Sequence, residues 1–293
     1  MESGSDPRLG AAIRAVGAWH GRDIGITPVS IGHDERHFMV EVDDELFVLR
    51  LTGPGPDDGR ADPDVEVEVT RAAAAAGVAS EVIAFLPQLR CLITRFAPGR
   101  RPSTADGANH ETLISIVGSM RALHACPLPG RDRSVFREAE EVHHVALMRG
   151  VRMPETEAAA TEAMRRIEDA CAEPSAPVTC HGDLSASSIF LDGAHVTIVD
   201  YRWAGAGDAF EDLGSVARCL GLSDESTDEL LDLYHGSADE GRRARLDLMR
   251  LATGYLAAMR SLARRDDEER SDAGHALALV AEMPADVVAD RHP

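Results

Sequence analysis

The 293-residue sequence contains no lysine, and all 30 of its basic residues are arginine. This absence excludes any mechanism that needs a lysine amine, such as a Schiff base. The 30 arginines are outnumbered by 50 acidic residues, which leaves a formal net charge of −20. Nucleic acids and anionic membranes bind basic surfaces. The charge therefore argues against both as partners.

Long apolar runs and paired cysteines are missing as well. No apolar stretch reaches the roughly 20 residues that span a bilayer. The N-terminal "MESGSDPRLG" lacks the basic-then-apolar order of a signal peptide. The five cysteines are odd in number and contain no CxxC pair, which argues against a disulfide framework or a zinc site. We therefore expect a cytoplasmic protein with reduced thiols.

The pattern that is present changes character near residue 97. Upstream, "FMVEV" and "LFVLRL" predict two strands joined by a tight turn, and "SEVIAFLPQLRCLITRF" predicts a second hairpin. "VEVEVTRAAAAAG" between them predicts a helix that ends at Gly77. Another helix is expected over "LGAAIRAVGAWH" at 9–20. The first part of the chain is therefore rich in strands.

Helical spacing dominates downstream of the break "APGRRPS". We predict an α+β fold with a small β-rich N-terminal lobe (1–96), a hinge (97–103) and a larger helical lobe (104–293). A cleft between two such lobes is the natural ligand site. The helices are expected at about 110–124, 138–149, 155–172, 211–221, 225–235, 238–265 and 268–282.

The segment "CHGDLSASSIFLDGAHVTIVD" (180–200) interrupts the helices. Asp192 and Gly193 between two apolar runs predict a hairpin, and a hairpin brings its ends together. Asp183 and Asp200 should therefore lie near each other. Converging carboxylates share a proton or hold a cation. Phosphoryl transfer uses such a pair, because one aspartate orients the attacking hydroxyl and the other binds magnesium.

Five segments, in this order, resemble the aminoglycoside phosphotransferase and choline/thiamine kinase superfamily, with the choline-kinase-like branch closest. The resemblance implies a two-lobed protein-kinase-like fold. It also implies an ATP- and Mg²⁺-dependent phosphotransferase that acts on a hydroxyl of a small molecule, namely an amino alcohol, a sugar or an antibiotic-like metabolite. The segments are "VLRL", "EVEVTRAAAAAGVASEVIAF", "LITRFAPG", "MRALHACPLPG" and "HGDLSASSIFLDGAHVTIVDYRWAGAGDAFEDLG".

The resemblance also implies roles for single residues. Asp183 would be the catalytic base, and Asp200 the magnesium ligand. Arg50 would contact the α- and β-phosphates of ATP and pair with Glu66. Glu68 is the rival to Glu66, because the helical register is open at this point. His181 would hold the catalytic loop by hydrogen bonds. Apart from the resemblance, we expect Asp208 and Asp212 to brace the loop by hydrogen bonding backbone amides rather than to bind metal.

Several positions depart from the family pattern. In the nucleotide-covering loop "SIGHDER" (30–36) Gly32 remains as a cofactor-binding residue, but Asp34 and Glu35 bring negative charge toward the phosphates. Ser188 stands where the family has an asparagine, so it is the candidate ligand for the nucleotide and a second magnesium. Arg202 replaces a glutamate and would repel a cationic substrate.

These departures support a second hypothesis from another class. The chain would then be a degenerate, non-catalytic kinase-like protein that binds a metabolite or a protein partner. Both hypotheses share one fold, so fold alone does not decide between them.

Overall fold

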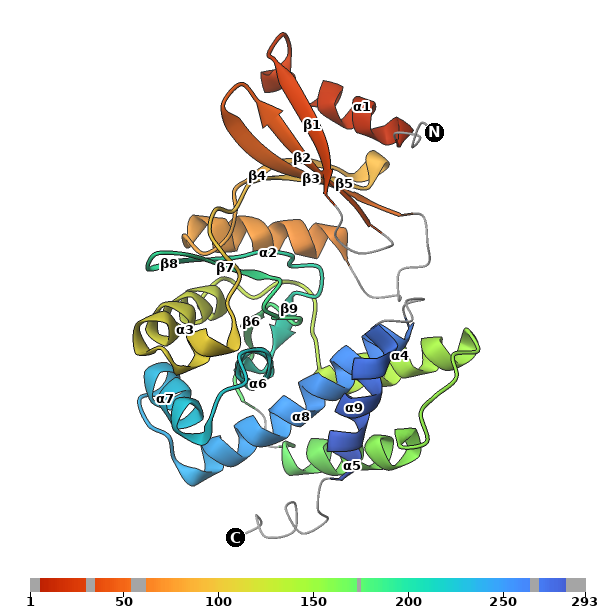
Figure 1. Ribbon diagram of the computed structural model, residues 1–293, viewed down its shortest axis with the longest axis vertical. Coiled ribbons are helices and arrows are strands. Elements are labelled where there is room, and N and C mark those ends of the chain that lie inside the picture. Colours follow the sequence, from red (N-terminus) through yellow and green to blue (C-terminus); the bar gives the residue numbers. More distant parts are fainter. Residues whose placement is uncertain (1–5, 30–34, 54–61, 173–174, 264–268, 283–293) are drawn as a thin grey trace.

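The apolar runs of the first 95 residues form a five-stranded antiparallel sheet with the order β1-β2-β3-β5-β4 (Figure 1). Its position and that of every other element come from a computed structural model, which describes residues 6–29, 35–53, 62–172, 175–263 and 269–282. The strands are β1 (Ile24–Val29), β2 (Glu35–Val42), β3 (Glu45–Thr52), β4 (Val82–Leu86) and β5 (Cys91–Arg95).

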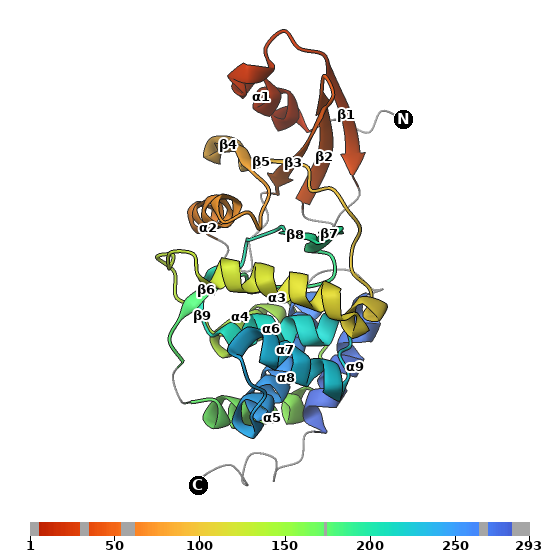
Figure 2. The same ribbon diagram turned by 90° about the vertical axis from the view of Figure 1, so that its left-hand side faces the viewer.

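Two helices flank this sheet on opposite sides (Figure 2). Helix α1 (Pro7–Ala15) and the short 3₁₀ turn η1 (Gly17–Trp19) share an apolar core with the sheet. Helix α2 (Pro63–Ala75) begins where the Asp62 side chain accepts hydrogen bonds from the amides of Asp64 and Val65, and it lies between the sheet and the rest of the molecule. One face of the sheet therefore packs against α1 and η1, and the other face is directed toward α2.

The second lobe is mostly helical. Residues 96–103 connect β5 to it, and η3 (Thr104–Ala108) opens it. Two small strand pairs are inserted: β6 (Val178–Cys180) with β9 (Gly205–Gly207), and the hairpin β7 (Ile189–Asp192) with β8 (His195–Ile198). The helices are α3 (His110–His124), α4 (Val135–Met148), α5 (Glu157–Ala170), α6 (Ala209–Cys219), α7 (Asp224–His235), α8 (Glu240–Ala263) and α9 (Glu269–Ala281). None of the described helices is long and apolar enough to cross a membrane.

The hairpin β7–β8 connects the two lobes through backbone hydrogen bonds. The amide of Ile198 donates to the carbonyl of Val78, just after α2, at 2.8 Å. Arg100 and Leu191 exchange bonds of 3.0 and 2.8 Å. The connection needs glycine at position 99, where φ is +109° and a Cβ atom would lie 2.4 Å from the Leu191 carbonyl oxygen. The hairpin therefore sits in a fixed place between the lobes.

The predicted α+β architecture, with a small β-rich lobe and a larger helical lobe, is confirmed. The boundaries at 97 and 103 stay a prediction. Two strands were not predicted: β1 contains Pro28 and is largely exposed, and β9 is only three residues long. Such short or exposed strands carry no clear alternation of apolar and polar residues.

Candidate active site

A buried carboxylate fixes the turn that carries Asp183. Asp212 on α6 accepts hydrogen bonds from the amides of His181 (2.7 Å) and Gly182 (3.0 Å). Burial alone would raise the pKa of Asp212, but the hydrogen bond and charge of His124 reverse this and lower the pKa to about 2. Asp212 is therefore an anion at neutral pH, as two amide donors require.

The imidazole of His181 ties the two predicted aspartates to one frame. Its Nδ1 accepts from the amide of Asp183 at 3.2 Å, and its Nε2 lies 2.9 Å from the carbonyl oxygen of Val199, the residue before Asp200. Gly182 makes the turn possible, because φ is +84° there and a Cβ atom would meet the Trp203 carbonyl oxygen at 2.4 Å. The ring thus spans the two ends of the hairpin.

Asp200 lies two residues beyond β8 with a positive φ of 70°. Its side chain is 41% exposed and forms two hydrogen bonds with Arg202, at 2.9 and 3.0 Å. Arg50 from β3 reaches the same carboxylate at 3.2 Å. Desolvation opposes ionisation of Asp200, but the charges of Arg202 and Arg50 outweigh it and hold its pKa below the usual range.

Arg50 also forms the ion pair between β3 and α2. Its Nη2 lies 2.5 Å from both carboxylate oxygens of Glu66, whose side chain is 6% exposed. Glu68 is exposed, so the helical register gives the contact to Glu66. Burial raises the pKa of Glu66 against the opposing charge of Arg50. Arg50, Glu66 and Arg202 line one cavity of about 140 Å³.

Two other predicted site residues contribute differently. The hydroxyl of Ser188 is buried and bonds within its own loop, accepting from the amide of Ser185 at 2.9 Å and donating to its carbonyl at 3.0 Å. The asparagine that the family has at this position is absent, and the chain's single asparagine, Asn109, caps α3. Gly32, predicted in the nucleotide-covering loop, lies outside the described residues.

Asp183 is held by an arginine that the sequence analysis missed. Its side chain is 34% exposed, and Oδ1 accepts from Arg260 of α8 at 2.7 Å. Arg260, itself 4% exposed, also donates to Glu138 of α4 at 2.9 Å and covers the ring of Trp203 at 4.1 Å. The signal was available, because Arg260 shares one helical face with the buried Leu256 and Ala263, and a buried charge needs a partner.

The aromatic side chains near the site are already packed. Tyr201 is buried with its ring 5.0 Å from that of His181, and Arg260 covers Trp203. Arg202 bonds to Asp200, and it is not among the residues that line the pocket beside Asp183. Arg202 would therefore repel a cation beside Asp200 and not in the pocket beside Asp183.

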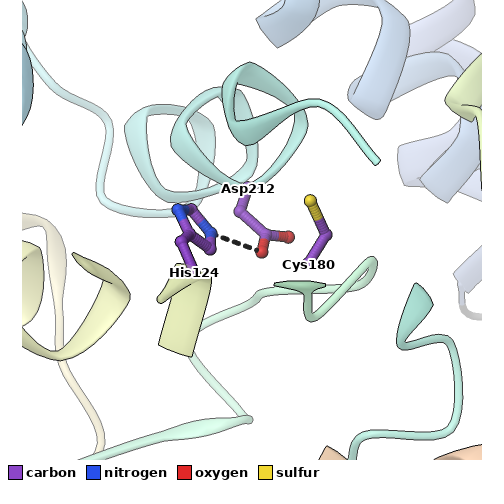
Figure 3. Close-up of side chains that lie close together, drawn as sticks. All are labelled: His124, Cys180 and Asp212. Atoms are coloured by element: carbon purple, nitrogen blue, oxygen red, sulfur yellow. Dashed lines mark hydrogen bonds and ion pairs between the residues drawn. The ribbon is translucent and has the colours of Figure 1, made fainter. Parts of the chain in front are cut away.

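Figure 3 shows a buried group of possible metal ligands, His124, Cys180 and Asp212, whose ligand atoms lie within 4.8 Å of one another. The two ring nitrogens of His124 bond to Asp212 at 3.1 Å and to the hydroxyl of Tyr234 at 2.5 Å. The Cys180 thiol donates to the carbonyl of Asp208, and burial raises its pKa well above the ordinary value. Since a metal ligand must be a thiolate, this group braces the loop.

Comparison with known proteins agrees with this geometry. A family model described as the phosphotransferase enzyme family (APH) matches residues 25–248, more than half of the chain. The chain belongs to this family. Both predicted aspartates, the Arg50–Glu66 pair and helix α6 lie within the matched residues, whereas Arg260 lies beyond them. Membership supports a small-molecule phosphotransferase and leaves the acceptor open.

Solved structures of other members of this fold are similar over almost the whole chain. A choline/ethanolamine kinase family protein from Mesorhizobium loti is 19% identical, with a TM-score of 0.79 over 96% of this chain and 97% of that one. Choline kinase LicA from Streptococcus pneumoniae is 9% identical, with a TM-score of 0.77 over 94% and 99%. At these identities the likeness shows the fold. No curated protein sequence matches significantly.

A third structure represents the antibiotic-modifying branch of this fold. It is a thermostable mutant of the aminoglycoside phosphotransferase APH(4)-Ia in a ternary complex with ADP and hygromycin B. It is 17% identical, with a TM-score of 0.65 over 94% of this chain and 98% of that one. The predicted resemblance to aminoglycoside phosphotransferases and choline kinases is therefore confirmed at the level of family and fold.

Proposed function

We propose that this protein transfers the γ-phosphoryl group of ATP, with Mg²⁺, to a hydroxyl of a small molecule. The carrying observation is the way His181 links Asp183 to the backbone next to Asp200, while Arg50 reaches Asp200 from the other lobe. Phosphoryl transfer needs positioned charges more than covalent chemistry. The ADP bound to the aminoglycoside phosphotransferase supports ATP as the donor.

Asp183 would act on the acceptor. Its carboxylate accepts the proton of the attacking hydroxyl, whose oxygen forms a bond to the γ-phosphorus as the bond from that phosphorus to the bridging β–γ oxygen breaks. The products are a phosphomonoester, ADP and a proton that Asp183 passes to solvent. Arg260 would orient the carboxylate through its 2.7 Å contact to Oδ1. Arg50 would hold the nucleotide phosphates.

Asp200 fits a magnesium ion, because its carboxylate is ionised and 41% exposed. Magnesium is usually held by one or two carboxylates together with substrate phosphates, so a single aspartate suffices. Bound there, the ion would neutralise charge on the phosphates. Arg202 competes for the same two oxygens. Ser188 stays the predicted second ligand, although its hydroxyl bonds to Ser185 in this structure.

The test is ADP release, over a panel of hydroxyl acceptors, by Asp183→Asn and Asp200→Ala. Removing the base or the metal ligand should lower kcat by 100-fold or more, about the contribution of one general base. Asp192→Asn is the matched control, since this exposed aspartate lies in the turn of the same hairpin. Transfer that survives unchanged in both site variants would refute the proposal.

A specific observation favours the second hypothesis, a non-catalytic binding protein. Both aspartates contact arginine side chains, Asp183 with Arg260 and Asp200 with Arg202, and these contacts take carboxylate oxygens that substrate and metal need. Calorimetry decides between the two. Binding of ATP–Mg²⁺ at millimolar nucleotide or below supports the kinase, and no heat at that concentration supports the binding protein.

A further inference from the structure

A pocket that is open to solvent lies directly beside Asp183, and its enclosed part is only about 10 Å³, about the space of one water molecule. Helices α6 and α8 supply most of the residues that line it. Its lining includes Asp183, the hydroxyl residues Ser215 and Thr253, and the arginines Arg218 and Arg260. Only a small polar group fits its enclosed part.

The ionic groups behind this pocket balance each other. Arg133 forms an ion pair with Glu211 and one of 3.3 Å with Glu138. Arg260 bonds to Glu138 and Asp183 at 2.9 and 2.7 Å. Every carboxylate in this group therefore already contacts a guanidinium. A cation entering the pocket would have to compete with these arginines.

Arg218, near the end of α6, is different. In the part of the chain that the structure describes, no hydrogen bond or ion pair is formed by its guanidinium, and its Nε is buried without a partner. The stem passes α8 at Gly254, where a Cβ atom would lie 3.4 Å from the Arg218 Cδ. A half-buried guanidinium without a partner loses hydration and gains no contact in return. It therefore favours an anion.

Recognition of a quaternary ammonium needs the free faces of aromatic rings. Here Arg260 covers the ring of Trp203 at 4.1 Å, and Tyr201 is 1% exposed. An arginine fork, in contrast, binds a carboxylate through two parallel hydrogen bonds. The described pocket thus lacks the features of a choline site and has those of a carboxylate site.

We propose that the acceptor is a small hydroxycarboxylic acid, whose carboxylate binds Arg218 while its hydroxyl faces Asp183. This inference rests on the proposed phosphotransfer for the role of the pocket, since it names the acceptor class of that reaction. Ser215 lines the same pocket with a hydroxyl that can donate a further hydrogen bond, whereas the hydroxyl of Thr253 donates to the carbonyl of Arg250 at 3.3 Å and can only accept. The anionic group is bound at one end and the reacting hydroxyl at the other.

The experiment is calorimetric titration of the full chain, without nucleotide, with acetate, glycolate, D-glycerate and L-malate, and separately with choline and ethanolamine. We expect at least one carboxylate to bind at millimolar concentration or below, and neither amino alcohol. Arg218→Gln should weaken that binding by about 10-fold or more, because a charge-assisted hydrogen-bond pair is lost. Arg218→Lys should retain part of it.

Arg165→Gln is the matched control, because this arginine is exposed on α5 and is not among the residues that line the pocket. Arg218→Gln should fold, since no ion pair is lost, and a thermal melt checks this. Binding of no carboxylate, equal carboxylate binding by wild type and Arg218→Gln, or tight choline binding that Arg218→Gln leaves unchanged each overturns the inference.

The two proposals can fail separately. Carboxylate binding that depends on Arg218, together with no binding of ATP–Mg²⁺, would keep the anion site and refute the phosphotransfer. Phosphorylation of an amino alcohol with no use of hydroxy acids would keep the phosphotransfer and refute the acceptor class.

Discussion

Substitution of Asp212 by asparagine tests the frame of the site directly. Asp212 accepts two backbone amides, at 2.7 and 3.0 Å, and a bond from His124 at 3.1 Å. An asparagine keeps the size but turns an NH₂ group toward donors. The folded-state pKa of about 2, against an ordinary value of 3.8, corresponds to about 2.5 kcal/mol of stability at neutral pH. We expect Asp212→Asn to lose about that amount, which lowers the Tm by roughly 5 °C.

The pH dependence gives this prediction its sign. The folded-state pKa is depressed, so the contribution is fully present above pH 3.8 and is lost as pH falls through about 2. The difference between wild type and Asp212→Asn, measured by urea unfolding, should therefore shrink to about half by pH 3.

Asp232→Asn is the control, an exposed aspartate on α7, and it should change stability by no more than about 0.5 kcal/mol. If Asp212→Asn behaves like this control, or if its effect is the same at pH 7 and pH 3, the reasoning is refuted. If Asp212→Asn also lowers kcat with little change in KM, the result would indicate that the loop positions Asp183.

Two further predictions concern charged groups at the site. Arg202→Ala should lower the Mg²⁺ concentration for half-maximal ATP binding by several-fold, because a partly exposed ion pair of up to about 1 kcal/mol no longer competes with the ion at Asp200. An unchanged or higher half-maximal Mg²⁺ concentration in calorimetry would contradict this. Burial raises the pKa of Glu211 to about 7 from an ordinary 4.5, against the charge of Arg133, so its contribution is present below pH 4.5 and is lost as pH rises through 7. Between pH 5 and 8 the free energy of unfolding of the wild type should therefore fall by up to about 3 kcal/mol more than that of Glu211→Gln. Parallel curves of unfolding free energy against pH would contradict this prediction.

Much of the fold was accessible from the sequence because the decisive signals are local. The Asp192–Gly193 turn between apolar runs predicted the β7–β8 hairpin, and the structure has it at Ile189–Ile198. Helix α3 was predicted at about 110–124 and spans His110–His124. The choice between Glu66 and Glu68 as the contact of Arg50 stayed open, because two residues on one helix differ by about 200° in direction, and only packing decides which faces the sheet.

The acceptor side of the site depended on contacts between distant segments. Arg260 and Glu138 meet across 122 residues of sequence, and Arg260 meets Asp183 across 77. Nothing in the pattern of α8 says which partner a buried arginine finds, although its place on an apolar face shows that it needs one. The surplus of positive charge at Arg218 is likewise visible only after every neighbouring ion pair has been placed.

The sequence by itself determined the family, most of the helices and the β7–β8 hairpin, and it predicted the convergence of Asp183 and Asp200, because these follow from local periodicity, a two-residue turn and an ordered set of motifs. Only the tertiary structure decided how the charges pair: Arg260 on Asp183, Arg202 on Asp200, and Arg218 without a partner among the described residues. The physical reason is that ion pairing depends on distances of a few ångströms between side chains, which helix packing sets and which residue order along the chain does not record.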